Sequence, residues 1–178
     1  MVRESKYKSM SNCKIDLSEI FRRLDSIAYS IIKLPCNFPS YNIGSDLDIF
    51  CYNAERVATI IISVLPSDSD FLVTKKSFQT HIDIMDDNDA IHFRFDLYWA
   101  MPMYASTMIK ESLFSSIIEN SIRLRRGGCM VKVPSVIDDV ILRYLEYQEW
   151  YGKRPDKIKH IMYIEEKLNR GEVSIDQF

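Results

Sequence analysis

The stretch Asn42-Ile43-Gly44-Ser45-Asp46-Leu47-Asp48-Ile49-Phe50 decides how the rest of the chain is interpreted. Its second half alternates acidic and apolar residues, which predicts a strand with Asp46 and Asp48 on one face and apolar side chains on the other. Two carboxylates about 7 Å apart on one strand face repel each other unless a positive group compensates them. Magnesium suits that role, because it prefers hard oxygen ligands and takes one or two carboxylates together with water and phosphate.

A second segment, His92-Phe93-Arg94-Phe95-Asp96-Leu97-Tyr98, contains a candidate for a third acidic ligand. Its apolar and polar residues alternate, so Arg94 and Asp96 share one strand face. If this strand lies beside that of Asp46, three carboxylates converge, and such a cluster can hold one or two metal ions against a triphosphate. Asp83, in the preceding strand, is a weaker rival for the third position because its strand is shorter and less strongly β-forming.

Each of these residues also has a simpler interpretation. Asp-x-Asp is a common pattern, and Ser-Asp can merely start a strand or cap a helix. Gly44 and Ser45 favour a phosphate site, because a backbone without a Cβ can approach a phosphate closely. Arg94 can pair with a phosphate or with the acidic cluster itself. His92, on the same strand face, is more often a structural hydrogen-bonding residue than a base.

Helix and strand patterns alternate on both sides of these segments. The expected helices begin at Asp16 and Ser18, Asn53, Ser106, Ser135 and Pro155, and Ser135 forms a capping box with Asp138. The expected strands are Tyr29–Leu34, Asp46–Tyr52, Phe71–Lys75, Thr80–Met85, Ile91–Trp99, Ser121–Arg126 and Cys129–Val133, the last two joined by a Gly127-Gly128 hairpin turn.

This order of elements predicts an α+β (or α/β) protein with a mixed sheet and helices packed on one side. Residues 15–133 are expected to form the main domain, and residues 134–178 a C-terminal helical pair packed on it. The aromatic residues of that pair are expected to lie in the seam between its helices: Tyr144, Tyr147, Trp150 and Tyr151.

Composition narrows the classes of function. The 178 residues are 47% hydrophobic and 27% charged, as in ordinary globular proteins, and the net charge of −2 gives no global field to attract a polyanion. A large nucleic-acid surface is therefore not indicated, whereas a small phosphorylated ligand needs only local charge. No nucleophile-elbow, P-loop or Gly-x-Gly-x-x-Gly motif supports a hydrolase or dinucleotide-binding protein.

The same sequence predicts a soluble, cytoplasmic protein. The first 14 residues are polar and lack the apolar stretch of a signal peptide, and no run approaches the ~20 apolar residues that cross a bilayer. The spacing of the four cysteines matches neither a metal-binding pair nor a disulfide framework. They are expected to be free thiols, mostly buried: Cys13, Cys36, Cys51 and Cys129.

The segment Gly44-Ser45-Asp46-Leu47-Asp48-Ile49 resembles the acidic signature of the DNA polymerase β-like nucleotidyltransferase superfamily. That superfamily has a third acid on a later strand, for which Asp96 is the match. The region from Tyr29 to Ile49 is similar, more particularly, to small bacterial stand-alone nucleotidyltransferase-like proteins. Two later segments are also similar to those proteins: Val133-Pro134-Ser135, ahead of a helix, and the basic segment Lys157-Ile158-Lys159-His160.

The resemblance implies that Asp46, Asp48 and Asp96 bind Mg²⁺ or Mn²⁺, that Asp96 can also accept a proton from an acceptor hydroxyl, and that Gly44 and Ser45 contact phosphates. It implies transfer of a nucleotidyl group from a nucleoside triphosphate to a small acceptor, such as a sugar phosphate or alcohol. Some members of the superfamily are associated with surface-polysaccharide pathways.

One departure from the superfamily pattern leaves alternatives open. Most members place Gly-Ser or Gly-Gly at the end of the first strand, where this chain has Ile31-Ile32-Lys33-Leu34-Pro35. Either Lys33 and the following loop take over the binding of the triphosphate, or nucleotide binding is weakened. The alternatives are a catalytically degenerate binding module, or a toxin–antitoxin component that modifies a macromolecule.

Overall fold

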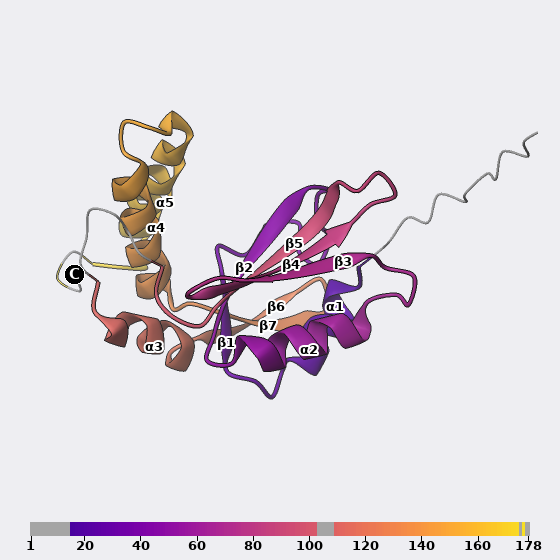
Figure 1. Ribbon diagram of the computed structural model, residues 1–178. Coiled ribbons are helices and arrows are strands. Elements are labelled where there is room, and N and C mark those ends of the chain that lie inside the picture. Colours follow the sequence, from indigo (N-terminus) through magenta and orange to yellow (C-terminus); the bar gives the residue numbers. More distant parts are fainter. Residues whose placement is uncertain (1–14, 103–108, 175, 177–178) are drawn as a thin grey trace, which may run out of the picture.

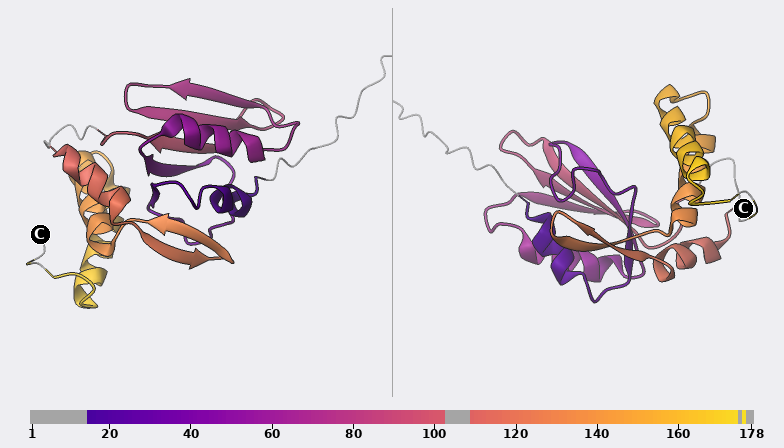
Figure 2. Two further views of the ribbon diagram at one scale, coloured as in Figure 1. Left: turned by 90° about the horizontal axis from the view of Figure 1, so that it is seen from below. Right: turned by 180° about the vertical axis from the view of Figure 1, so that it is seen from behind.

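The computed structural model describes residues 15–102, 109–174 and 176 (Figures 1 and 2). The N-terminal tail, Cys13 and the expected helix start at Ser106 lie outside the described residues. In chain order the elements are α1 (Leu17–Arg23), β1 (Tyr29–Ile32), β2 (Ser45–Cys51), α2 (Ala54–Val64), β3 (Phe71–Lys75), β4 (Gln79–Met85), β5 (Ile91–Tyr98), α3 (Glu111–Glu119), β6 (Ile122–Arg126), β7 (Cys129–Val133), α4 (Val136–Trp150), the 3-10 helix η1 (Pro155–Lys157) and α5 (Ile158–Asn169).

Five strands form a mixed sheet in the order β1-β2-β5-β4-β3. β2 and β5 run parallel, and the other neighbours in this sheet are antiparallel. The acidic strand β2 therefore lies inside the sheet, between β1 and β5. This arrangement confirms the predicted α+β class and its mixed sheet.

One face of the sheet is covered by α1 and α2, as Figures 1 and 2 show. The main core lies between them, and its fully buried side chains include Phe21, Ile49, Ile61 and Phe95. Each such side chain contributes roughly 1.5–3 kcal/mol to folding through the apolar surface it buries. The opposite face of β2 and β5 is left for polar residues, because side chains alternate along a strand.

The C-terminal pair of α4 and α5 stands at one end of the sheet, away from α1 and α2 (Figure 1). Its link to the sheet is a second, smaller core in which Leu142 of α4 packs with Ile32 of β1 and Phe50 of β2. Residues of α3 complete this core: Phe114, Ile117 and Ile118. This core fixes α4 at the end of β1, close to Lys33, the residue that follows the strand.

The predicted caps and hairpin are found, while several element ends differ from the prediction, most of them by one residue. The side chains of Asn53 and Ser135 accept hydrogen bonds from the backbone of α2 and α4, as their N-cap positions require. β1 ends at Ile32 instead of Leu34, because Lys33 adopts a left-handed backbone with φ of 54°. Pro155 begins a short 3-10 turn, and α5 itself starts at Ile158.

Among the described cysteines, Cys51 and Cys129 are buried free thiols, as expected, whereas Cys36 is exposed in the loop after β1. No helix in the described part of the chain combines the length and apolar character needed to cross a membrane.

The β6–β7 turn gives a matched pair of substitutions. Gly127 and Gly128 have φ values of 52° and 81°, so an alanine at either position costs about 1–2 kcal/mol. Only at Gly127 would the added Cβ also meet Pro39, 2.2 Å from its Cδ, whereas at Gly128 nothing lies within 4 Å. We expect Gly127→Ala to lower the free energy of unfolding by about 2–4 kcal/mol, and Gly128→Ala by about 1–2 kcal/mol, in urea denaturation. Equal losses would show that the hairpin does not pack on Pro39.

Candidate active site

The parallel pairing of β2 with β5 brings the predicted acids together. In this register Asp48 is the neighbour of Asp96, and Asp46 is the neighbour of Arg94. Paired residues on adjacent strands share a face of the sheet, so the three carboxylates lie on the face opposite α1 and α2. The prediction that the two acidic strands are neighbours is confirmed.

Asp48 has the most perturbed carboxylate of the three. Burial raises its pKa to about 6, and the negative charges of Asp46, Asp96 and Glu146 act in the same direction. The Lys33 ammonium opposes them, with its Nζ 3.7 Å from Asp48 Oδ2. The ionised form of a carboxylate in such surroundings is stabilised by any further positive charge that approaches it.

Asp96 is buried and already has one partner on the neighbouring strand β4 and another on its own strand β5. His81 Nδ1 and Asp96 Oδ1 form a hydrogen bond, and Arg94 Nε lies 4.0 Å from the same oxygen. Burial raises the pKa of Asp96, while His81 and Arg94 act to lower it. His81 Nε2 is buried without a hydrogen-bond partner among the described residues. From the sequence, His81 was assigned no role.

Arg94 and Asp83 form an ion pair across β5 and β4, in which Arg94 Nε donates to Asp83 Oδ1. Of the two alternatives for Arg94, the structure therefore contains the pairing with acids, and a contact with phosphate stays a prediction. Asp83, the rival for the third ligand position, is engaged by this guanidinium.

The turn before β2 is held by its own hydrogen bonds. Gly44 has a φ of 77° and donates its N–H to the carbonyl of His92 at 2.8 Å. The Ser45 hydroxyl donates to the carbonyl of Asn42 at 2.6 Å. His92 Nε2 lies 3.1 Å from Tyr41 Oη, which fits a structural role for this histidine. Contact of Gly44 and Ser45 with phosphate stays a prediction.

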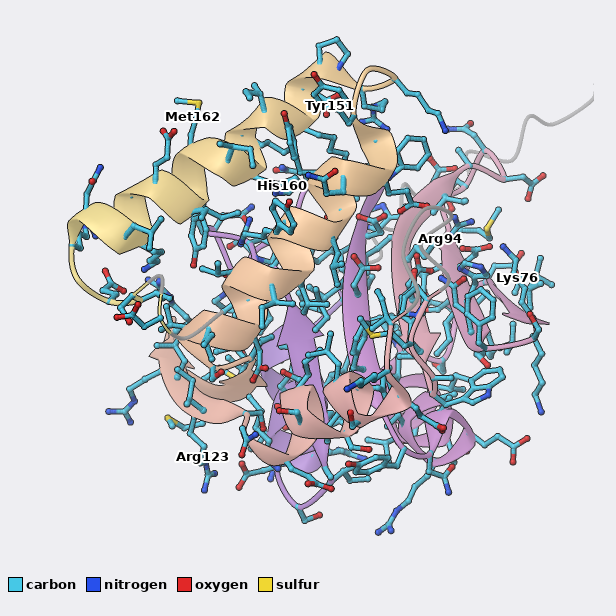
Figure 3. The ribbon with its side chains drawn as sticks, turned by 90° about the vertical axis from the view of Figure 1, so that its left-hand side faces the viewer. Lys76, Arg94, Arg123, Tyr151, His160 and Met162 are labelled. Atoms are coloured by element: carbon cyan, nitrogen blue, oxygen red, sulfur yellow. The ribbon has the colours of Figure 1, made fainter. Side chains whose placement is uncertain are left out.

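A cavity of about 790 Å³ lies over Asp46, Asp48 and Asp96, between the sheet, the loop after β1 and the C-terminal pair. Figure 3 shows the two terminal helices beside the sheet, with His160 on their side and Arg94 on the sheet. The volume is within the range of small-ligand sites, about 300–1,000 Å³. Side chains from the C-terminal pair contribute a mixed set of charges to the lining: Arg143, Glu146, Glu149, Lys157, Lys159 and His160.

Glu146 of α4 is the centre of a charge cluster that the sequence did not reveal. Its Oε2 is 2.6 Å from Lys33 Nζ, its Oε1 accepts from Lys157 Nζ, and His160 Nε2 lies 3.5 Å from Oε2. Burial alone would raise the pKa of Glu146, but the ammonium groups of Lys33 and Lys157 outweigh it and hold the pKa at about 2. Glu146 is 113 residues from Lys33, so no local motif could have linked them.

The expected aromatic seam between the terminal helices was wrong in part. Tyr144 and Tyr151 are 49% and 70% exposed, so neither is packed between α4 and α5. Trp150 lines the cavity, and the Arg154 guanidinium lies over its ring, 5.8 Å from the ring centroid. Lys157, which directly precedes α5, and His160 of α5 both approach Glu146 of α4.

Asp46 and Asp48 offer hard oxygen donors on one strand face, which fits a magnesium ion whose other ligands are water and phosphate. Within the described ranges, however, no group of three or more His, Cys, Asp or Glu side chains is arranged to hold a metal ion by itself. The bond from His81 engages Asp96, and three carboxylates without a cation repel each other. The role of Asp96 as third ligand stays a prediction.

Comparison with known proteins supports the fold. No protein-family model matches the chain, and no curated protein matches its sequence. The structure is similar to that of an antigenic nucleotidyltransferase-like protein from Paracoccidioides brasiliensis, with a TM-score of 0.51 and 16% identity over 87% of this chain and 76% of that chain. A weaker similarity, to JHP933 from Helicobacter pylori, covers 85% of this chain and 72% of that chain, with a TM-score of 0.37 and 10% identity. The chain therefore has a nucleotidyltransferase-like fold.

The raised pKa of Asp48 makes a prediction about stability. An acid with a pKa of about 6 in the folded protein and about 4 when unfolded destabilises the fold once it is ionised. We expect Asp48→Asn to raise the free energy of unfolding at pH 7 by about 1–3 kcal/mol, with the gain falling to zero as the pH drops from 6 to 4. Urea denaturation between pH 4 and 8 measures this. Asp46→Asn is the matched control at an exposed position, and an equal gain there would contradict the assignment to Asp48.

Proposed function

We propose that this protein is a nucleotidyltransferase that moves a nucleotidyl group from a nucleoside triphosphate to the hydroxyl of a small acceptor, such as a sugar phosphate or an alcohol. The observation that carries the proposal is the register of β2 and β5, which places Asp48 beside Asp96 under the cavity, with Asp46 on the same face. Asp46 and Asp48 are the residues that would hold Mg²⁺ or Mn²⁺, with Asp96 as the proposed third ligand. A bound divalent ion supplies charge neutralisation for the triphosphate and helps to lower the pKa of an attacking hydroxyl.

The residues of the chain can be given roles in an in-line displacement. The acceptor oxygen forms a bond to the α-phosphorus while the bond from that phosphorus to the bridging oxygen breaks, and pyrophosphate leaves. Asp96 is the candidate for accepting the hydroxyl proton, because burial raises its pKa towards the range that suits a general base. His81 holds the Asp96 carboxylate in one orientation through its hydrogen bond.

Lys33 is the candidate for binding the triphosphate at the position where the superfamily has glycine and serine. Its backbone adopts the left-handed conformation that glycine favours, with φ of 54°. Its side chain lines the cavity next to Asp48. Lys33 keeps its charge, because burial lowers its pKa but Asp48 and Glu146 raise it by more.

A binding module without catalysis is the second candidate, and the same lysine favours it. The ammonium of Lys33 lies 3.7 Å from Asp48 Oδ2 and already supplies part of the positive charge that the acid requires. A protein of this kind would bind a nucleotide without dependence on magnesium and without forming a product. The two candidates are therefore separated by the metal dependence of binding.

Incubation with labelled nucleoside triphosphates, Mg²⁺ and a panel of sugar phosphates and alcohols tests the enzymatic proposal. We expect magnesium-dependent release of pyrophosphate that falls at least about 100-fold in Asp48→Asn, because loss of a charge that acts in the transition state typically has effects of this size. Asp68→Asn, in the exposed turn between α2 and β3, is the control and should retain full activity.

Unchanged turnover in Asp48→Asn would reject these acids as the catalytic centre. Nucleotide binding that is independent of Mg²⁺, with no product from any acceptor, would favour the binding module instead.

A further inference from the structure

Lys33 lies between two carboxylates that belong to different parts of the fold. Its Nζ is 2.6 Å from Glu146 Oε2 on α4 and 3.7 Å from Asp48 Oδ2 on β2. The first distance is that of a charge-assisted hydrogen bond, and the second is not. The ammonium is therefore bonded to the C-terminal helix and only faces the acidic strand.

We propose that Glu146 is a positioning residue that holds the Lys33 ammonium off Asp48, so that the carboxylate stays available to a divalent cation. This inference rests on the proposed function, since it assigns to Asp48 the role of metal ligand. In the same position, Lys33 remains beside the cavity, where its two other N–H donors can meet a phosphate.

The surroundings of Glu146 suit this role. Each of its carboxylate oxygens is bonded to a different lysine, Lys33 on Oε2 and Lys157 on Oε1, so the carboxylate has little freedom to turn. Leu142 lies one helical turn before Glu146 on the same side of α4 and packs in the small core with Ile32, which directly precedes Lys33. The helix is thereby fixed against the end of β1, and the carboxylate is fixed against the lysine.

Removal of the Glu146 charge has a predictable electrostatic result. Asp48 becomes the nearest carboxylate to Lys33, and closure of the gap to hydrogen-bond distance forms an ion pair inside the site. A divalent cation must then displace this ammonium before it can bind Asp48. The added attraction in a partly buried site corresponds to about a tenfold loss of metal affinity.

Binding of Mn²⁺ alone, followed by the electron paramagnetic resonance signal of the free ion, tests the inference without knowledge of the nucleotide. We expect the dissociation constant for Mn²⁺ to rise about tenfold in Glu146→Gln relative to the unmodified protein. Glu149→Gln is the matched control, since Glu149 lies on the same helix and lines the same cavity, but no ion pair links it to Lys33 among the described contacts. This control should leave the constant unchanged.

A second background separates positioning from a general loss of structure. In Lys33→Gln the competing ammonium is gone, so Mn²⁺ binding should be as tight as in the unmodified protein or tighter. Adding Glu146→Gln to that background should then have no further effect on the constant. The double variant removes both partners of the Lys33–Glu146 ion pair, so Lys157 is then the lysine that has lost its carboxylate partner.

The outcomes distinguish this inference from the proposed function. If the unmodified protein binds Mn²⁺ through Asp48, as judged by loss of binding in Asp48→Asn, but Glu146→Gln binds it equally well, only the positioning role is overturned. The positioning role alone is also overturned if Glu146→Gln weakens Mn²⁺ binding by the same factor in the Lys33→Gln background as in the unmodified protein. If neither the unmodified protein nor Lys33→Gln binds Mn²⁺, the metal site of the proposed function fails, and the positioning role fails with it.

Discussion

The parallel pairing of β2 with β5 is the constraint on which both the core and the site depend. The pairing that directs Leu47 and Phe95 into the main core also places Asp48 beside Asp96 on the other face. A slip of one residue in this register would bury carboxylates against α1 and α2 and expose the apolar side chains. The cost of burying those charges is large, so the hydrophobic pattern of the two strands fixes the position of the acids.

The acids of this face are compensated individually, by side chains from three different elements. Lys33 after β1 faces Asp48, His81 of β4 bonds to Asp96, and Arg94 of β5 bonds to Asp83. Partial compensation leaves the pKa of Asp48 and of Asp96 raised, which is typical of residues kept for binding or proton transfer at some expense of stability. Perturbed acids of this kind are what the proposed function requires of this face.

The sequence was sufficient for those features that depend on local pattern. Alternation along β2 and β5, the caps at Asn53 and Ser135, and the Gly127-Gly128 turn each depend on a few adjacent residues, and all are found in the structure. The end of β1 was misplaced because the left-handed backbone of Lys33 has no signal in a residue type that rarely adopts it. Glu146 could not be predicted for another reason. The packing of α4 on the sheet brings its partners to it, and this packing cannot be predicted from the spacing of residues along the chain.

The contact between Lys33 and Glu146 joins two parts of the chain that are synthesised at different times. The ribosome releases the N-terminal part first, so the five-stranded sheet emerges before residue 146, which lies 113 positions after its lysine partner. Lys33 therefore obtains its bonded carboxylate on α4 only after all five strands of the sheet have been synthesised.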